Sequence, residues 1–72
     1  MDFKAEYIVL VIRKFAEHYA LSVKQAYLYL KKYAGIAFID KCYDAEHTLS
    51  VDDAIIDLTQ VCRNNGGDLV YA

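Results

Sequence analysis

Two cysteines and two histidines are the residues of this chain best suited to chemistry, because thiolates and imidazoles bind zinc. Structural zinc sites usually draw their ligands in close pairs, such as two cysteines separated by two to four residues. Here Cys42 and Cys62 stand 20 positions apart, and His18 and His47 stand 29 positions apart. The spacing therefore predicts no metal site, and we expect no cofactor. Both cysteines are interpreted as small buried hydrophobic residues on inward helix faces.

Cys42 and His47, with acidic residues between them, also have the residue types of a cysteine nucleophile and its base. No oxyanion-hole motif accompanies them, and 72 residues leave little room for a substrate cleft. We therefore predict that the protein is not an enzyme. In Y-D-A-E-H-T, residues 43–48, His47 and Thr48 are expected to bond the local backbone and fix the turn into the next helix. A contact with a partner is the alternative role for this stretch.

The segment F-A-E-H-Y-A-L-S-V-K-Q-A-Y-L-Y-L-K-K-Y, residues 15–33, looks like a helix-turn-helix. Lys24 and Gln25 would stand at the start of its second helix, where base edges are read, and Lys31 would lie near the phosphates. The turn lacks the usual glycine, arginine is nearly absent and the net charge is −2. Nucleic-acid binding is accordingly the alternative hypothesis for function, and nucleic acid is not the partner that we expect.

Two similar phrases show where helices begin: L-S-V-K-Q-A at residues 21–26 and L-S-V-D-D-A at residues 49–54. Ser22 with Gln25 three residues later has the pattern of a capping box, in which each side chain bonds the other residue's backbone N–H. Ser50 and Asp53 repeat the pattern with a shorter acid. Asp2 is placed to cap a first helix.

Apolar periodicity and the absence of proline predict an all-α fold, a compact bundle of four short helices that forms a single domain over residues 1–72. We expect Gly35 to end the second helix in a left-handed conformation. The tail D-L-V-Y-A should pack on the core or in an interface. The expected elements are a helix from Asp2 to about Ala20, helices Val23–Tyr33, Ile36–Tyr43 and Val51–Asn64, and a loop at Asp44–Leu49.

The first two helices carry apolar residues beyond those that one buried stripe needs. The inward stripe of the first is expected to hold Phe3, Tyr7, Val11 and Phe15, with Ile8, Ile12 and Tyr19 beside them, and that of the second Val23, Ala26, Tyr27, Leu30 and Tyr33. The apolar residues that lie off these stripes are predicted to contact a partner: Val9, Leu10, Leu28 and Tyr29.

Composition supports association as well. The hydrophobic share is 57%, and seven tyrosines supply side chains suited to interfaces. A chain of this length also has a small core, which oligomerisation commonly supplements. We expect a protein partner or a homo-oligomer, a dimer first of all.

The apolar run Tyr7–Ile12 is too short for a signal peptide or a membrane span, and Glu6 precedes it. Two cysteines without a secretory signal are typical of reduced thiols. We therefore expect a cytoplasmic protein with no membrane contact.

The segment F-I-D-K-C-Y-D-A-E-H-T-L-S-V-D-D-A-I-I-D-L, residues 38–58, resembles a family of short bacterial proteins of unknown function. Members share a Tyr-x-x-x-His-Thr core, here Tyr43, His47 and Thr48, followed by an acidic helix. The apolar first helix and the Ser-capped second helix also fit that family, although the glycine-rich tail departs from its pattern. The resemblance implies no assigned activity. It implies that this chain is an accessory or antitoxin-like partner of a neighbouring protein.

Overall fold

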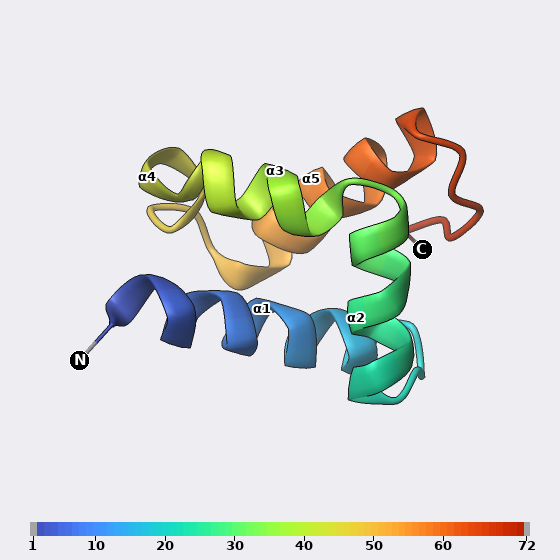
Figure 1. Ribbon diagram of the computed structural model, residues 1–72, viewed down its shortest axis with the longest axis horizontal. Helices are drawn as coiled ribbons and strands as arrows, with labels where there is room; N and C mark the ends of the chain where they lie inside the picture. The colour runs from blue at the N-terminus through green and yellow to red at the C-terminus, as the bar shows by residue number, and fades with distance from the viewer. Residues whose placement is uncertain (1, 72) are drawn as a thin grey trace.

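The computed structural model describes residues 2–71, and within them the chain forms helices and no strand. The all-α prediction is confirmed, with four helices of seven residues or more and one additional helix of a single turn (Figure 1). The elements are α1 (Phe3–His18), α2 (Val23–Lys32), α3 (Gly35–Lys41), α4 (Tyr43–Glu46) and α5 (Val51–Asn64). The short α4 takes in the first half of the segment Asp44–Leu49 that was expected to be a loop, so that prediction is wrong there. The third helix ends at Lys41, and Tyr43, expected at its end, begins α4.

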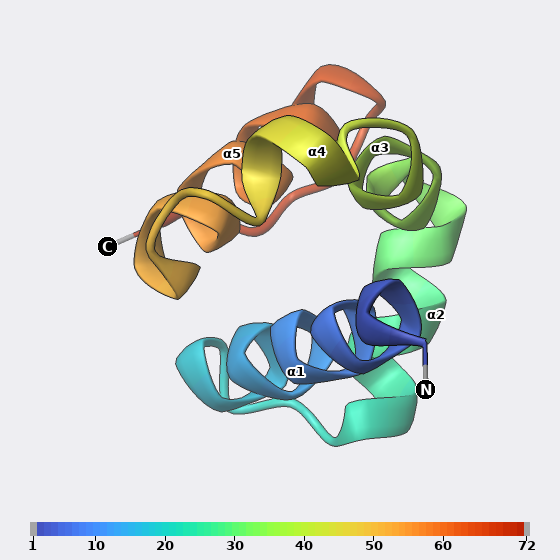
Figure 2. The ribbon, with the colours of Figure 1, turned by 90° about the vertical axis from the view of Figure 1, so that its left-hand side faces the viewer.

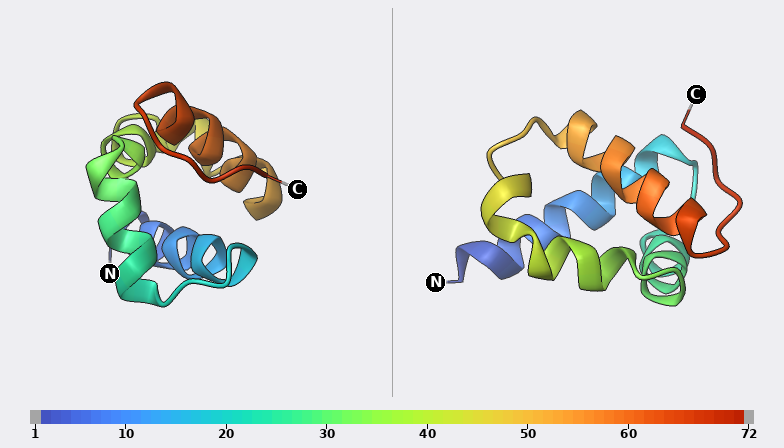
Figure 3. Two further views of the ribbon diagram at one scale, coloured as in Figure 1. Left: turned by 90° about the vertical axis from the view of Figure 1, so that its right-hand side faces the viewer. Right: turned by 90° about the horizontal axis from the view of Figure 1, so that it is seen from above.

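The helices form two sides joined at one end. α1 lies along one side, α3, α4 and α5 lie along the other, and α2 stands across one end and connects them (Figures 1 and 2). The tail after α5 turns back across the gap between the two sides (Figure 3). The molecule measures 33 × 22 × 21 Å. In this arrangement α1 contacts the other elements on one face only.

Side-chain caps start three of the helices as predicted. Asp2 accepts hydrogen bonds from the backbone N–H groups of Lys4 and Ala5, at 3.1 and 3.2 Å. Ser22 and Gln25 bond each other's backbone N–H at 3.0 and 2.9 Å, which completes a capping box. Ser50 accepts from the N–H of residue 53 at 3.1 Å, but within residues 2–71 the Asp53 side chain does not bond back to Ser50, so the second predicted capping box forms only by half. These caps satisfy backbone donors that the first turn of a helix leaves free.

The turn between α2 and α3 differs from the prediction. Ala34, not Gly35, adopts the left-handed conformation, with φ at 68°, and Gly35 is the first residue of α3. Gly35 is buried where two helices approach closely: a Cβ atom there would lie 2.7 Å from Leu30 Cδ2 and 3.1 Å from Cys62 Sγ. The glycine is therefore needed for packing rather than for a positive φ.

Replacing Gly35 by alanine is expected to lower the free energy of unfolding by about 1–3 kcal/mol, because the added methyl group overpacks a close contact. The matched variant Ala34→Gly puts glycine where φ is already positive and should be neutral or slightly stabilising. Urea unfolding followed by circular dichroism measures both. Equal stability of Gly35→Ala and the wild type would contradict this explanation of the turn.

The core lies between the two sides. Phe15 is fully buried at its centre. Phe3, expected in the same stripe, is instead 69% exposed, because it is the first residue of α1 and lies beyond the core that the middle of the helix covers. The buried hydrophobic residues are Val11, Ile12, Phe15, Ala16, Ala26, Leu30, Ile39, Ala54, Ile55, Leu58 and Cys62.

The inward face of α2 is also rotated relative to the prediction. Val23 and Tyr27, which were expected to face the core, are exposed, whereas Tyr29 packs against the core. The ring of Tyr29 lies 6.0 Å from that of Phe15, and its hydroxyl accepts a hydrogen bond from the N–H of Leu69 at 3.1 Å. Contacts with α1 and with the tail thus select Tyr29 over Tyr27.

The tail packs on the core through Leu69, one of its two predicted placements, while Val70 stays 59% exposed. Leu69 contacts the core, and the ring of Tyr71 stacks on that of His18 with 4.4 Å between centroids. Gly67 permits the approach, because a Cβ atom there would collide with the hydroxyl of Tyr29. The tail therefore joins the end of α5 to the end of α1.

Candidate functional site

The Tyr-x-x-x-His-Thr residues lie on and just after α4. His47 Nδ1 lies 2.7 Å from the carbonyl oxygen of Tyr43, and the two rings stack with 4.5 Å between centroids. The hydroxyl of Thr48 donates to the carbonyl of Ala45 at 2.7 Å. Both carbonyls also accept a backbone N–H, that of Tyr43 from His47 at 2.9 Å and that of Ala45 from Thr48 at 3.3 Å, so the side chains add a second bond to each. This geometry gives the motif a role in holding α4.

Tyr7 connects this motif to α1. Its hydroxyl donates to the carbonyl oxygen of Glu46 at 3.0 Å, and its ring meets that of Tyr43 edge to face at 5.5 Å. Burial raises the pKa of the Tyr7 hydroxyl, and the neighbouring carboxyl of Glu46 raises it further. Lys4 adds an ion pair with Asp40 at 2.9 Å. These contacts fasten the start of α1 to α3 and α4.

Glu46 is a buried acid that the sequence analysis missed. Only 6% of it is exposed, and its Oε1 atom has no hydrogen-bond partner within residues 2–71. Burial raises the pKa of its carboxyl from 4.5 to about 7, and the adjacent carboxyl of Asp57 on α5 adds to the shift through a hydrogen bond and its charge. The residues around Glu46 in the sequence do not distinguish it from the other acids nearby. Its burial results from the packing of α4 on the other helices, which the local sequence does not show.

The cysteines and histidines are not assembled into a nucleophilic or metal-binding site. Cys62 lies in the core, where burial raises the pKa of its thiol to about 11, and Cys42 is half-buried. His47 is exposed, with Nδ1 directed at a backbone carbonyl. In the part of the chain that the structure describes, no three His, Cys, Asp or Glu side chains are grouped to hold a metal ion.

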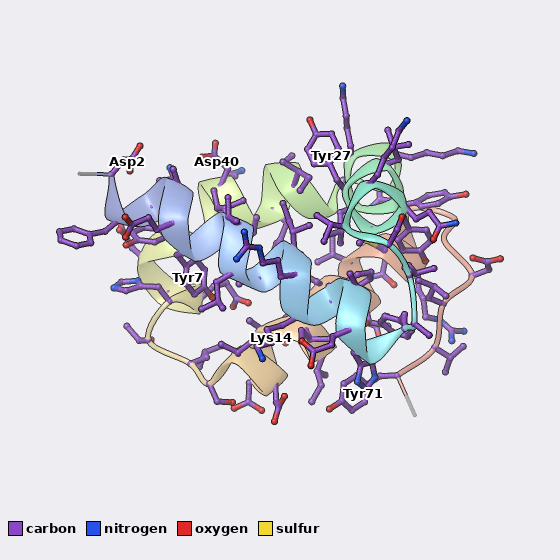
Figure 4. The ribbon with its side chains drawn as sticks, turned by 90° about the horizontal axis from the view of Figure 1, so that it is seen from below. Asp2, Tyr7, Lys14, Tyr27, Asp40 and Tyr71 are labelled. Carbon is purple, nitrogen blue, oxygen red and sulfur yellow. The ribbon has the colours of Figure 1, made fainter. Side chains whose placement is uncertain are left out.

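Of the predicted contact residues, two lie side by side on the outer side of α1. Val9 is 47% exposed and Leu10 is 41% exposed. Together with Ala5, Glu6 and Arg13 they line a shallow hollow of about 400 Å³, on the side of the helix that faces away from the core. Figure 4 views the molecule from this side, with α1 nearest the reader. We call these five residues the α1 outer face.

The other two predicted contact residues are on α2 and differ from each other. Leu28 is exposed, as its position off the inward stripe required. Tyr29 is half-buried, with its ring on the core and its hydroxyl bonded to the tail, so the prediction that it lies on an outward face is wrong. The structure thus groups Val9 with Leu10 and leaves Leu28 on a separate helix.

A second hollow, of about 270 Å³, lies between α1 and α5. Its lining mixes charges of both signs, and Lys14 forms an ion pair with Glu17 across 3.5 Å at its edge. These side chains do not converge on one point as a substrate or anion site would require. The lining residues are Lys14, Glu17, His18, Asp52 and Ile55.

The residues of the helix-turn-helix hypothesis have mixed placements. Lys24 and Lys31 are exposed on α2, as a recognition helix would need. The side chain of Gln25, expected to read bases, accepts a hydrogen bond from the N–H of Ser22 in the capping box. Nucleic-acid binding stays an untested alternative.

Within residues 2–71, none of the helices combines the length and apolarity that crossing a bilayer demands.

Comparison with known proteins identifies one family. Residues 6–65 match the model of a family described as a protein of unknown function, DUF3791. The match takes in most of the chain, from the end of the first turn of α1 to the residue after α5. No curated protein and no solved structure gives a significant match.

Proposed function

The chain belongs to the DUF3791 family, whose function is unknown, and we propose that it is a non-enzymatic module that binds another protein chain through the α1 outer face. The observation that carries the proposal is the pair Val9 and Leu10, which α1 leaves uncovered while its opposite side is buried. Adjacent aliphatic side chains that line a hollow are typical of a docking surface, whereas isolated ones are ordinary.

The pattern of α1 supports this reading. A helix that packs on one side only needs apolar residues along one stripe, and polar residues normally occupy the rest. In α1 the stripe Val11, Ile12 and Phe15 meets the core, yet Val9 and Leu10 continue the apolar surface on the far side. Removing such side chains from water is favourable at about 25 cal/mol per Å². A partner chain gives them that environment.

The polar residues favour binding over catalysis. His47, Thr48 and Tyr7 direct their polar atoms to backbone carbonyls, which positions helices and leaves no obvious base beside a nucleophile. Within the proposal, a protein that works by association could serve as an accessory or antitoxin-like partner of a neighbouring protein. The dimeric and cytoplasmic character expected from the sequence belongs to the same proposal.

Affinity capture from the native host, with the wild type and Val9→Glu as baits, tests the proposal. A buried charge without a counter-charge is unfavourable in an interface, so we expect Val9→Glu to retain at least about tenfold less of any bound protein, a second copy included. The matched control is Ile56→Glu, a similarly exposed aliphatic residue on α5, which should retain wild-type binding. Both variants should keep the helical circular dichroism. Equal capture by the wild type and Val9→Glu would refute the proposal.

A further inference from the structure

We infer that the occupant of the α1 outer face is a second copy of the same chain, with the two α1 helices antiparallel about a two-fold axis between Val9 and Leu10. This inference rests on the proposed function and deepens it by naming the partner. It follows from the order of charges along the face.

The α1 outer face has a symmetric composition. Counted from Glu6, the next residues of the face follow after three, four and seven positions: Val9, Leu10 and Arg13. This spacing places all four on one side of a helix. An acid stands one turn before the apolar pair and a base one turn after it. The face is thus apolar in the middle, negative at one end and positive at the other.

An antiparallel two-fold arrangement matches each of these residues with its complement. A residue on the N-terminal side of the axis in one copy faces the residue that lies equally far on the C-terminal side of the axis in the other copy. Val9 then faces Leu10 of the second copy, and Glu6 faces Arg13 of the second copy. Since the interface is isologous, both ion pairs form at once. A parallel arrangement would instead place like charges opposite each other, which is unfavourable.

The two charges are free to make these pairs. Within residues 2–71 the ion pairs are Lys4 with Asp40 and Lys14 with Glu17, and neither Glu6 nor Arg13 takes part in them. The helix has 16 residues and is therefore about 24 Å long. No element lies over the outer side of its first three turns (Figures 1 and 2). A second α1 can approach there along its length.

The contact is small, and this determines how it must be measured. Two short helices that share one face bury less than the roughly 1,200 Å² of a standard interface, so we expect a transient dimer with a dissociation constant in the micromolar range or weaker. Association should therefore depend strongly on concentration.

Charge reversal tests the inference by sedimentation equilibrium over about a hundredfold range of concentration. Glu6→Arg alone and Arg13→Glu alone each set like charges opposite each other at both ends of the contact, so each should weaken self-association at least about tenfold. An equal mixture of the two variants restores complementary charges between unlike chains and should associate about as strongly as the wild type. The chain that carries both changes should also recover.

The mixing result separates this inference from simpler explanations. A general effect of charge on solubility or folding would not be reversed by combining two defective chains. If either single variant loses helicity, Glu6→Gln and Arg13→Gln replace them. Each alone removes both ion pairs and should weaken association, and their mixture should recover in part, because one Glu6–Arg13 pair forms between the unlike chains.

Single variants that associate like the wild type, or a mixture that stays monomeric, would overturn the antiparallel pairing. A wild type that stays monomeric throughout the range would overturn the inference as a whole. In that case the proposed function stands only if Val9→Glu still abolishes capture of a protein of different sequence.

Discussion

Replacing Phe15 by alanine is expected to remove most of the stability of this protein. Phe15 is fully buried between the two sides, with its ring 4.8 Å from that of Tyr19 and 6.0 Å from that of Tyr29. Truncation of a buried phenylalanine to alanine lowers the free energy of unfolding by about 3–5 kcal/mol, because apolar contacts are lost and a cavity remains. Domains of this size have about 4–10 kcal/mol in total.

The same helix provides a matched control. Phe3→Ala removes the same side chain from a position where it is largely exposed, so the change in unfolding free energy should stay within about 0.5 kcal/mol. Urea unfolding followed by far-ultraviolet circular dichroism measures both variants. Similar losses in the two variants would show that Phe15 is not at the centre of the core.

Glu46 is expected to make the stability of the protein depend on pH. Because its pKa is raised from 4.5 to about 7 by burial and by Asp57, the folded protein holds a proton that the unfolded chain releases. Its contribution is most favourable below pH 4.5 and is lost as the pH rises from 4.5 to 7. A shift of this size corresponds to about 3 kcal/mol, since each pKa unit is worth about 1.4 kcal/mol. The groups facing it are Asp57 from α5 and Tyr7 from α1.

Glu46→Gln isolates this effect. The amide keeps the shape of the protonated acid, can donate to Asp57, and does not ionise. At pH 8 we expect the variant to be about 1–3 kcal/mol more stable than the wild type, and the difference should disappear near pH 4. Asp44→Asn, an exposed acid on the same helix, should show no such difference. Parallel stability curves for the wild type and Glu46→Gln would contradict the burial of an ionisable carboxyl here.

The helix starts could be predicted from sequence because their causes are local. Asp2, Ser22 and Ser50 bond N–H groups two or three residues away, so the pattern of residue types contains the whole interaction. The all-α class follows from periodicity for the same reason. Gly35 could not be interpreted this way, because its role depends on the packing of Leu30 and Cys62 against it, and Cys62 lies on a distant part of the chain.

The orientation of α2 needed tertiary information too. Ala26 and Leu30 face the core, and the buried stripe could extend from them toward Val23 and Tyr27 or toward Tyr29 and Tyr33. Phe15 and the N–H of Leu69 favour the side of Tyr29, and neither contact is visible from local pattern.

The residues of the candidate site also divide into those that could be predicted from the sequence and those that depend on tertiary contacts. Val9 and Leu10 could be identified as uncovered because α1 has more apolar residues than one stripe can bury. The bonds of His47 and Thr48 lie within four residues and could be expected. Glu46 could not, because Tyr7 and Asp57 reach it across 39 and 11 positions of the chain.

The most direct test of the proposed contact surface is a methyl-detected NMR titration of the wild-type chain, from about 20 µM to about 1 mM, a range that brackets a weak dimer. The methyl resonances of Ala5, Val9 and Leu10 should move together with concentration, while those of Ile56 and Val70, which are also exposed, stay in place. Movement at Ile56 or Val70 with none on the α1 outer face, or no movement anywhere, would contradict self-association through α1.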